Sequence, residues 1–387
     1  MHMLIQCTKK VLDRLHIDAK AAAPTEIAVD DFFCWHANII TADRRKVLIF
    51  VNNSTRLAVI CYRPKPPAYK KMYEYLAAGV RELFSTLNVH PEVIEQYLQL
   101  AGAAQITTSG TRSQIARMNK VAEDIAWHSP FFREDQELQT GASVELADFP
   151  MSEGKSYMVP QERLYEELCR MMGIPADAEH LDQVRSCRSY ILKITLDLEN
   201  YKIFRTIEAP VYAKFYQLHG AIQKTFGWLG YHLHNFTFYD GEVVPGQKRM
   251  YYGMKRRLVI TDYEDPAAQD YFEPEEQDLY SDRQLMLCDL FENNRSCVYS
   301  YDFGDDWEHV ITVEERKQKD GSTRFVLLEK EGDRPPEDVG GEGGFEEFMR
   351  IMSNPEDPEY ENMKRWAEVT GAKAESLEEI NKKLRWL

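Results

Sequence analysis

The sequence predicts an α+β protein of two domains, in which each domain is a mostly antiparallel sheet packed with helices. The chain has 387 residues, which is too many for one ordinary hydrophobic core and suits two domains of typical size. Short β-branched runs alternate with turn-forming clusters and with amphipathic segments of helical period. No period is sustained over residues 129–159. We therefore expect a domain at 1–128, a linker with a short helix at 129–187, and a domain at 188–387.

The first domain opens with four short apolar runs. These are LIQCTK, HANII, KVLIFVN and RLAVICY, and the turn-like clusters ADRR and NNST separate them. This pattern predicts an antiparallel meander. Helices are predicted at about 68–87, at 91–101 with Pro91 in the first turn, and at 112–127. The segment PQERLYEELCRMMG predicts the short helix of the linker.

The second domain opens with YILKITLDL, a strand buried on at least one face. An amphipathic helix is predicted over 211–226, and its apolar face is formed by Phe215, Leu218, Ile222 and Phe226. The segment GYHLHNFTFYDGE then returns to period two, which is typical of a strand. Side chains two residues apart on a strand share a face, so we expect His232 and His234 to point the same way.

The segment CVYSYDFGDDWEHVITVEE predicts a β-hairpin. Apolar side chains alternate on both sides of Gly304 and Asp305, which are turn formers and mark the tip. The period places His309 on the same face as Trp307, toward the core, while Glu308 points the other way. A buried imidazole needs a hydrogen-bond partner, because an unpaired buried polar group costs about 1–3 kcal/mol.

Composition and charge exclude several classes of protein. The seven cysteines are scattered without a C-x-x-C pair, so no disulfide framework or zinc ribbon is predicted. No run of eighteen apolar residues and no secretory signal is present, and we expect a cytoplasmic protein without membrane contact. Residues 1–130 hold 16 Lys and Arg against 12 Asp and Glu, a balance of +4, so the remainder carries −20 and the whole chain −16. This charge disfavours nucleic acid and favours a basic partner.

Three histidines raise the question of a metal. His232 and His234 at positions i and i+2 could converge on one ion, and His309 from a neighbouring strand would add a third imidazole. The alternative is that all three are polar core residues held by Asp or Tyr partners. A divalent ion such as zinc is therefore one hypothesis, and the absence of any cofactor is the other.

Three ordered motifs carry a resemblance to a known family. GAIQKTFGWLGYHLHNFTF, YSYDFGDDWEHVITVE and RPPEDVGGEGGFEEFMRIMSNPEDPEY are similar to the successive motifs of the plasmid pRiA4b ORF-3-like family. The resemblance covers about residues 188–370 and implies an α+β domain, without an established activity, encoded on plasmids and transposable elements. The N-terminal half resembles a separate small domain of unknown function that begins LIQCTK and contains W-H-A-N.

The resemblance can be followed position by position. His232 and His234 match the family's H-x-H, and Asp305, Asp306, Trp307 and His309 match its D-D-W-x-H. Glu337, Asp338, Gly340 and Gly341 match P-P-E-D-x-G-G. Members often have cysteine at two further positions of this last motif, where this chain has Arg334 and Val339. Any metal role of those thiolates is therefore absent here.

Two further segments suggest ligands. PPEDVGGEGGFEEF places glycines before a helix, but the surrounding carboxylates and the lack of G-K-S or G-K-T argue against a phosphate loop. We expect a tight turn there, and Glu337 and Asp338 could accept hydrogen bonds from the histidines. QKRMYYGMKRR is the dense basic patch of the C-terminal half, with Lys248, Arg249, Tyr251 and Tyr252 as candidates for stacking on single-stranded nucleic acid. A solvated hairpin is the alternative.

These observations lead to three hypotheses. No G-x-S-x-G, H-E-x-x-H or dinucleotide motif is present, so the first hypothesis is a non-enzymatic intracellular binding protein of mobile-element context. It would present a polar aromatic cleft, lined by Trp228, Tyr301 and Trp307, to a basic protein or peptide. The second is a metal-dependent hydrolase or nuclease, with the three histidines as ligands. Its further ligands or general base would be Asp305, Asp306, Glu337 and Asp338. The third is accessory DNA binding through residues 247–257.

Overall fold

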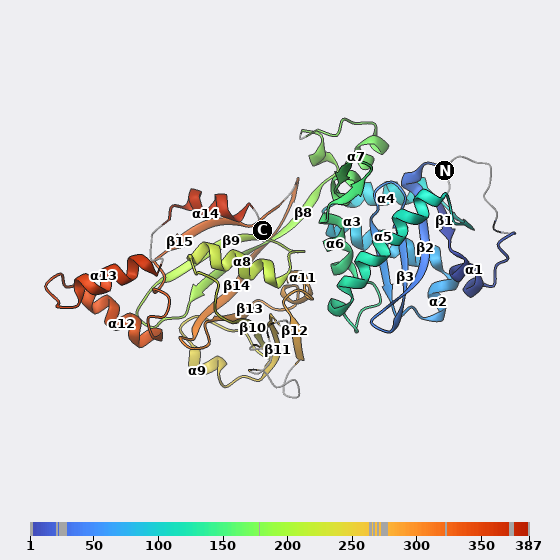
Figure 1. The fold of residues 1–387 in the computed structure, drawn as a ribbon. Helices are drawn as coiled ribbons and strands as arrows, with labels where there is room; N and C mark the ends of the chain where they lie inside the picture. Colours follow the sequence, from blue (N-terminus) through green and yellow to red (C-terminus); the bar gives the residue numbers. More distant parts are fainter. Residues whose placement is uncertain are drawn as a thin grey trace. The chain divides into compact units, whose positions relative to one another are not determined.

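The computed structural model describes residues 3–385 with the exception of 21, 23–28, 178, 263–264, 266–267, 269–270, 272–277, 322 and 371–374 (Figure 1). The chain divides into two compact units. One comprises Met1–Cys187 with Lys319–Ser322, and the other comprises Arg188–Gln318 with Thr323–Leu387. Helices and sheets are both present in each unit, so the predicted α+β class is confirmed.

The first unit contains a five-stranded sheet of order β4-β3-β2-β1-β5. Its strands are β1 (Met3–Cys7), β2 (Cys34–Ala42), β3 (Arg45–Asn52), β4 (Ala58–Tyr62) and β5 (Ala104–Thr108). β2, β3 and β4 form the predicted antiparallel meander, but β1 pairs in parallel with both β2 and β5. The long connection from β1 to β2, which contains α1 (Lys9–Leu15), permits the parallel pairing that a tight turn would forbid.

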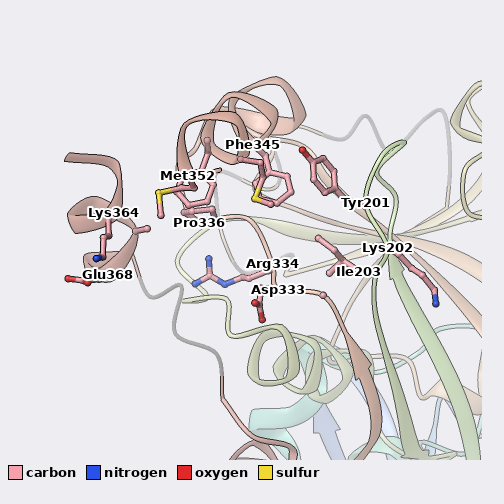
Figure 2. Close-up of a pocket in the computed structure, with 14 residues that line it drawn as sticks. Tyr201, Lys202, Ile203, Asp333, Arg334, Pro336, Phe345, Met352, Lys364 and Glu368 are labelled. Carbon is pink, nitrogen blue, oxygen red and sulfur yellow. The ribbon is translucent and has the colours of Figure 1, made fainter. Parts of the chain in front are cut away.

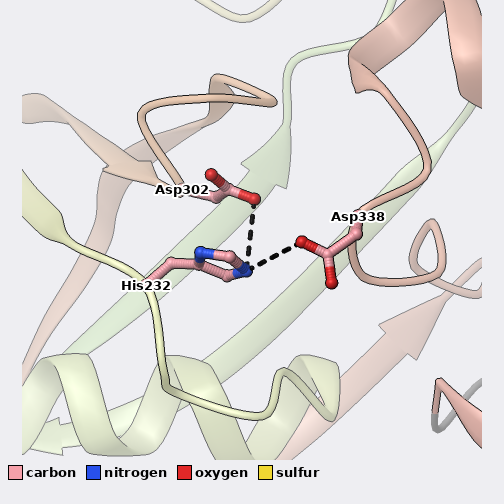
Figure 3. A group of neighbouring side chains, drawn as sticks. All are labelled: His232, Asp302 and Asp338. Carbon is pink, nitrogen blue, oxygen red and sulfur yellow. Dashed lines mark ion pairs between the residues drawn. The ribbon is translucent and has the colours of Figure 1, made fainter.

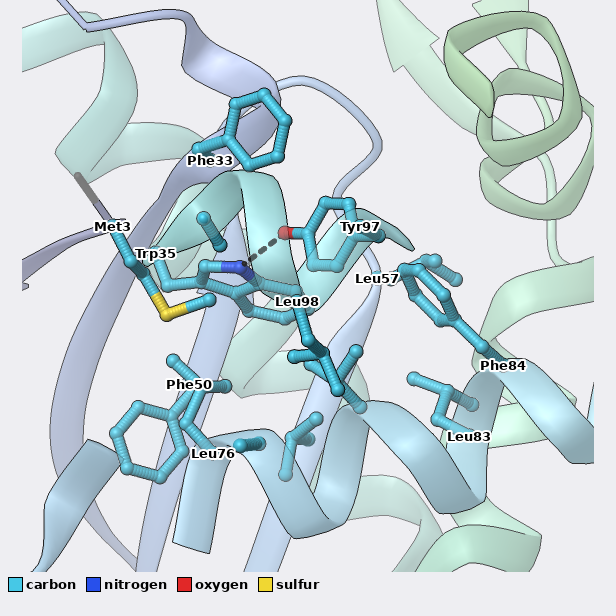
Figure 4. Close-up of a cluster of buried hydrophobic side chains, with 14 of the residues drawn as sticks. Met3, Phe33, Trp35, Phe50, Leu57, Leu76, Leu83, Phe84, Tyr97 and Leu98 are labelled. Atoms are coloured by element: carbon cyan, nitrogen blue, oxygen red, sulfur yellow. Dashed lines mark hydrogen bonds between the residues drawn. The ribbon is translucent and has the colours of Figure 1, made fainter. Parts of the chain in front are cut away.

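Helices close to the predicted positions cover this sheet. They are α2 (Pro66–Lys70), α3 (Met72–Thr86), α4 (Pro91–Ala101) and α5 (Arg112–His128). Figure 4 shows the core between the sheet and α3 and α4. There the indole Nε1 of Trp35 donates to Tyr97 Oη at 3.0 Å, and Tyr97 Oη donates to Phe32 O at 2.9 Å. Both rings are fully buried, so each polar tip requires the partner that it has.

Residues 129–187 do not form the predicted linker, and the first unit does not end at residue 128. This segment contains η2 (Ser129–Phe131), α6 (Thr140–Asp148), β6 (Met151–Glu153), β7 (Ser156–Met158), α7 (Pro160–Met172) and η3 (Leu181–Gln183). Leu164 and Leu168 of α7 are fully buried in the core of the first unit, and the backbone of Gln139 bonds to β4. The elements between residues 129 and 159 are too short to show a period in the sequence, yet their tertiary contacts order them.

The second unit contains an eight-stranded sheet of order β12-β11-β10-β13-β14-β8-β9-β15. Its strands are β8 (Ser186–Leu196), β9 (Ile203–Pro210), β10 (His234–Tyr239), β11 (Arg256–Thr261), β12 (Asp278–Ser281), β13 (Ser296–Tyr301), β14 (Trp307–Asp320) and β15 (Val326–Glu331). β11 and β12 pair in parallel, whereas β10 pairs antiparallel with β11 and β13, and β9 pairs antiparallel with β8 and β15. β13 and β14 form the predicted hairpin.

Two layers cover this sheet on opposite faces. α8 (Phe215–Phe226) packs its predicted apolar side chains into the larger core, which also takes up Trp307 and Ile311 of β14. A smaller cluster on the other face joins Val310 to Tyr251 of α9 (Lys248–Tyr251). The remaining helices are α11 (Leu287–Phe291), α12 (Gly341–Met352), α13 (Tyr360–Val369) and α14 (Leu377–Leu384). Alternate side chains of β14 therefore point into two buried layers, and the period of the sequence predicted one of these layers.

Within the described part of the chain, no helix combines the length and the apolar composition needed to cross a bilayer.

Candidate metal site

The predicted histidine cluster does not form, because each of the three side chains has its own surroundings. His232 lies in the loop before β10 and not on the strand, which begins at His234. α8 ends at Gly227 in a left-handed conformation with φ 83°, and the loop from there to His232 passes beside the end of β13. The expectation that His232 and His234 share a strand face is therefore wrong.

His309 is a core residue with both ring nitrogens occupied. It is fully buried, and its Nε2 lies 3.4 Å from the indole Nε1 of Trp228, a group that can only donate. Nδ1 therefore carries the proton, and it faces the carbonyl oxygens of Trp307 at 3.0 Å and Tyr299 at 3.3 Å. Burial lowers the pKa of His309 to about 3. A neutral imidazole with no free lone pair cannot bind a metal.

His234 faces a different partner. Its ring stacks on His219 with centroids 3.6 Å apart, and its Nε2 lies 3.4 Å from Asp282 Oδ2. The hydroxyl of Tyr299 accepts a hydrogen bond from Gln223 Nε2 and lies 2.9 Å from His219 Nδ1. Burial, followed by the neighbouring His234, lowers the pKa of His219 well below its usual value. This pair belongs to the core beneath α8.

His232 instead meets carboxylates from two other segments (Figure 3). Its Nε2 lies 3.4 Å from Asp302 Oδ2 and 3.3 Å from Asp338 Oδ1, and the three ligand atoms lie within 4.8 Å of one another. Nε2 is nevertheless buried without a hydrogen-bond partner, so it aims at neither carboxylate. A nitrogen lone pair directed between two carboxylate oxygens is the arrangement that a metal ion requires.

Glu337 approaches His232 from the buried side of the cluster. It is fully buried, and its Oε1 accepts from the backbone N–H of Leu229 at 2.6 Å and from Tyr301 Oη at 3.4 Å. Its Oε2 lies 3.9 Å from His232 Nε2 and has no hydrogen-bond partner. Burial raises the pKa of Glu337, and the amide of Leu229 and the charge of Arg334 oppose that rise. Glu337 and Asp338 do lie near His232, but the expected hydrogen bonds from a histidine are not made, because His232 Nε2 has no hydrogen-bond partner.

Two tight turns hold these carboxylates in place. Asp302 ends β13 with φ 59°, and its Oδ1 accepts from the amide of Gly304 at 3.0 Å, which leaves Oδ2 for His232. Asp338 has φ 55° in the turn before α12. The amide of Gly340 donates to Asp305 Oδ2 at 3.1 Å and so joins the two turns. Positive φ is uncommon outside glycine, and aspartate is among the residues that tolerate it best.

Two of the predicted carboxylates, Asp305 and Asp306, do not face His232, and one carboxylate that does face it was not predicted. Asp305 fastens the turns together, and Asp306 is not among the carboxylates that face His232; burial raises its pKa. Asp302, absent from the predicted site, supplies the carboxylate that faces His232. The sequence offered one signal for it, because Asp302 is the first polar residue after the buried alternation of β13. That signal does not distinguish a ligand from a turn former.

The three aromatic residues that were predicted to line a cleft are buried in the core. Trp228, Tyr301 and Trp307 are 5%, 0% and 1% exposed, and the two indoles stack with centroids 5.9 Å apart. Rings that are buried against one another cannot line an open surface. The exposed aromatic residue at the site is Tyr231, whose hydroxyl donates to Asp338 Oδ2 at 3.1 Å.

The predicted basic patch is partly buried as well. Tyr251 is 1% exposed, and its hydroxyl lies 2.9 Å from Asp197 Oδ2 and 3.0 Å from Glu308 Oε2. Its ring cannot stack on a base. Tyr252 is exposed but donates to Glu308, and Lys248 lies 3.8 Å from the same carboxylate. The side chain of Arg249 lies outside the described residues.

Comparison with known proteins shows similarity to two families and to individual proteins. Residues 188–377 match the family described as plasmid pRiA4b ORF-3-like protein, and residues 4–163 match a domain of unknown function, DUF6933. The uncharacterized protein y4hQ of Sinorhizobium fredii is 28% identical over 181 residues, which cover 45% of this chain and 78% of the relative. The crystal structure of the protein of unknown function MM3350 from Methanosarcina mazei Go1 has 27% identity and a TM-score of 0.37, and the match covers 46% of this chain and 89% of that one.

Proposed function

In this chain, which joins a DUF6933 domain to a pRiA4b ORF-3-like domain, we propose that the second domain is a metal-dependent hydrolase. Its single divalent ion would be held by His232, Asp302 and Asp338. The observation that carries the proposal is the pair of buried atoms without hydrogen bonds, Nε2 of His232 and Oε2 of Glu337, which lie 3.9 Å apart. Buried polar groups in folded proteins are almost always paired. Nε2 of His234 is also unpaired, but it faces Asp282 alone, whereas Nε2 of His232 faces three carboxylates, so the His232 cluster fits a metal ion better.

The chemistry of the donors favours an ion of intermediate hardness. One imidazole and two or three carboxylates suit Mn²⁺, Fe²⁺ or Zn²⁺ better than Ca²⁺, which takes oxygen ligands alone. The carboxylates of Asp302 and Asp338 would together match the charge of a divalent cation. This balance explains how a cluster of carboxylates can be stable in a partly buried position.

The openness of the site favours catalysis over a purely structural role. Structural metal sites are closed, whereas catalytic sites keep a position for water or substrate. Here the side chain of Asp338 is 60% exposed and Tyr231 is 56% exposed, while Asp302 and Glu337 are buried. A bound divalent ion would supply an activated water at the open side.

Glu337 fits the role of proton acceptor and donor. It approaches the site from the buried side, its Oε1 is fixed by Leu229 and Tyr301, and its Oε2 remains free. Burial raises the pKa of this carboxyl above its ordinary value, which is the direction that suits a general acid and base. The acidic surroundings favour a neutral or positively charged substrate, in agreement with the basic partner that the net charge predicts.

Metal binding can be tested directly. Protein without a histidine tag, treated with chelator and dialysed, is titrated calorimetrically with Mn²⁺ and with Zn²⁺. We expect one ion per chain, and Asp302→Asn should weaken binding by at least about tenfold. Asp305→Asn is the matched control, because Asp305 lies on the same turn and does not face His232, and the Oδ1 of asparagine can still accept the bond from the Gly340 amide. The proposal fails if the wild-type protein takes no ion or if the two variants bind equally.

A further inference from the structure

A cavity that is lined by none of the residues around His232 lies between α12, α13 and the start of β9 (Figure 2). Its volume is about 660 Å³, which is within the range of about 300–1,000 Å³ typical of small-molecule sites. The walls are mostly apolar, and the residues that form them include Tyr201, Ile203, Phe345, Phe348, Met349 and Met352. Such a lining accommodates an apolar body and supplies few hydrogen-bond partners for a polar one.

Arg334 is the buried charged residue of this mostly apolar lining. Its residue surface is only 5% exposed, and one face of the guanidinium lies 4.8 Å from the ring centroid of Trp228. Three N–H groups donate to backbone carbonyls: Nε to Gly227, Nη1 to Pro335 and Nη2 to Thr370, at 2.9, 2.6 and 3.1 Å. A guanidinium has five N–H groups, so two remain available.

The charge of Arg334 is not compensated by an ion pair. Among the residues that the structure describes, no carboxylate lies within ion-pair distance of it. Burial lowers the pKa of Arg334, and Glu337 opposes that shift from beyond ion-pair distance. Burial of an unpaired cation is costly, and a carboxylate that reached the free N–H groups would recover part of that cost through a charge-assisted hydrogen bond.

We propose that this cavity binds a small amphiphilic molecule with an apolar body and one carboxylate, whose carboxylate pairs with Arg334. The inference is independent of the metal site, because none of the metal-binding side chains lines the cavity. Other charged residues also line or border the cavity: Lys202 pairs with Glu331 at 2.6 Å, Lys364 and Glu368 lie one turn apart on α13, and Asp333 directly precedes Arg334. A single anionic group on the ligand is therefore favoured over two.

The test compares two probes of the same length. Decanoate and decylammonium are titrated calorimetrically into the full chain, at concentrations below micelle formation. We expect decanoate to bind once per chain, and decylammonium to bind at least about tenfold more weakly, a difference equivalent to about 1.4 kcal/mol. Equal affinity for the two probes, or no binding of decanoate, would overturn the proposal.

A variant locates the binding in this cavity. Met352→Trp places a larger side chain in the lining and keeps Arg334 itself, and we expect it to weaken decanoate binding by at least about tenfold. Met250→Trp is the control, because Met250 is 57% exposed and lies outside the cavity. Far-ultraviolet circular dichroism and the melting temperature confirm that both variants are folded. Undiminished binding to folded Met352→Trp would contradict the assignment.

Discussion

His232 and His309 belong to the same domain and to neighbouring strands or loops, yet their surroundings are opposite. Both ring nitrogens of His309 meet complementary groups, and its side chain is fully buried. Nε2 of His232 faces carboxylates at distances of 3.3–3.9 Å and makes no hydrogen bond. The comparison teaches that burial beside aromatic residues does not separate a structural histidine from a ligand. The distinguishing property is whether each ring nitrogen has a hydrogen-bond partner.

The largest expected effect is on the structural member of the pair. His309→Ala removes a fully buried ring and leaves the indole N–H of Trp228 and two carbonyls without their partner. We expect the free energy of unfolding to fall by about 2–5 kcal/mol, measured by urea denaturation. A loss below about 1 kcal/mol would show that the ring is not the centre of this core.

A smaller effect is expected from the other end of the same hydrogen bond. Trp228→Phe keeps an aromatic ring for packing but removes the Nε1 donor to His309. The expected loss is about 1–3 kcal/mol, because the acceptor remains buried. Trp127→Phe serves as control, since Trp127 is 81% exposed and its substitution should change stability by less than about 0.5 kcal/mol.

Acid should weaken the fold through His309. Its pKa is about 3 in the folded protein against an ordinary value of 6.5. Between these pH values the imidazole of His309 is protonated in the unfolded chain and neutral in the folded chain. The free energy of unfolding therefore falls as the pH drops from 6.5 toward 3. The slope due to this residue reaches at most about 1.4 kcal/mol per pH unit.

The measurement compares urea denaturation of the wild type and of His309→Asn at pH 7, 6, 5 and 4. Other titrating groups are common to both proteins, so the difference in slope isolates the imidazole. The variant should lose less stability than the wild type over this interval. Parallel curves would contradict the assignment of His309 as a neutral core residue.

The smallest effect on stability is expected at His232. In metal-free protein, His232→Ala removes no hydrogen bond made by Nε2, and we expect a change of less than about 1 kcal/mol. The same variant should abolish the rise in melting temperature that Mn²⁺ or Zn²⁺ produces in the wild type. That rise corresponds to about 2.7 kcal/mol when the free ion is at a hundredfold excess over its Kd.

A control for His232 is available in the other unit. His180→Ala disrupts an exposed pair in which Nδ1 lies 2.7 Å from Asp177 Oδ1, a contact with normal hydrogen-bond geometry. It should leave the response to metal unchanged. If His232→Ala cost as much stability as His309→Ala, the proposed contrast between the two histidines would be wrong.

Local patterns in the sequence predicted much of the second domain. The alternation around Gly304 gave the β13–β14 hairpin and the inward direction of His309 and Trp307, and the helical period gave the buried face of α8. These features depend on residues within a few positions of one another. The helix α7 was predicted from its sequence, whereas β5 and α6 were missed, because they have weak local periods and are ordered by contacts with distant segments.

The candidate site shows the same division. The sequence identified His232, Glu337 and Asp338 as members of one polar cluster, from complementary polarity and from the motifs that they share with a family. It also placed His234 and His309 in that cluster and omitted Asp302. The choice between them depends on which loops meet, and the turns at Asp302 and Asp338 set that meeting through a bond between Asp305 and Gly340.

By itself, the sequence determined the α+β class, the acidic character, the hairpin and the set of side chains from which a site could be built. Periodicity and turn chemistry act over short distances, so they can be read along the chain. Only the tertiary structure decided which imidazole is satisfied and which is left facing carboxylates, and that a lone guanidinium borders an apolar cavity. Those properties depend on partners more than a hundred residues apart, such as Arg334 and Gly227, and no local pattern records them.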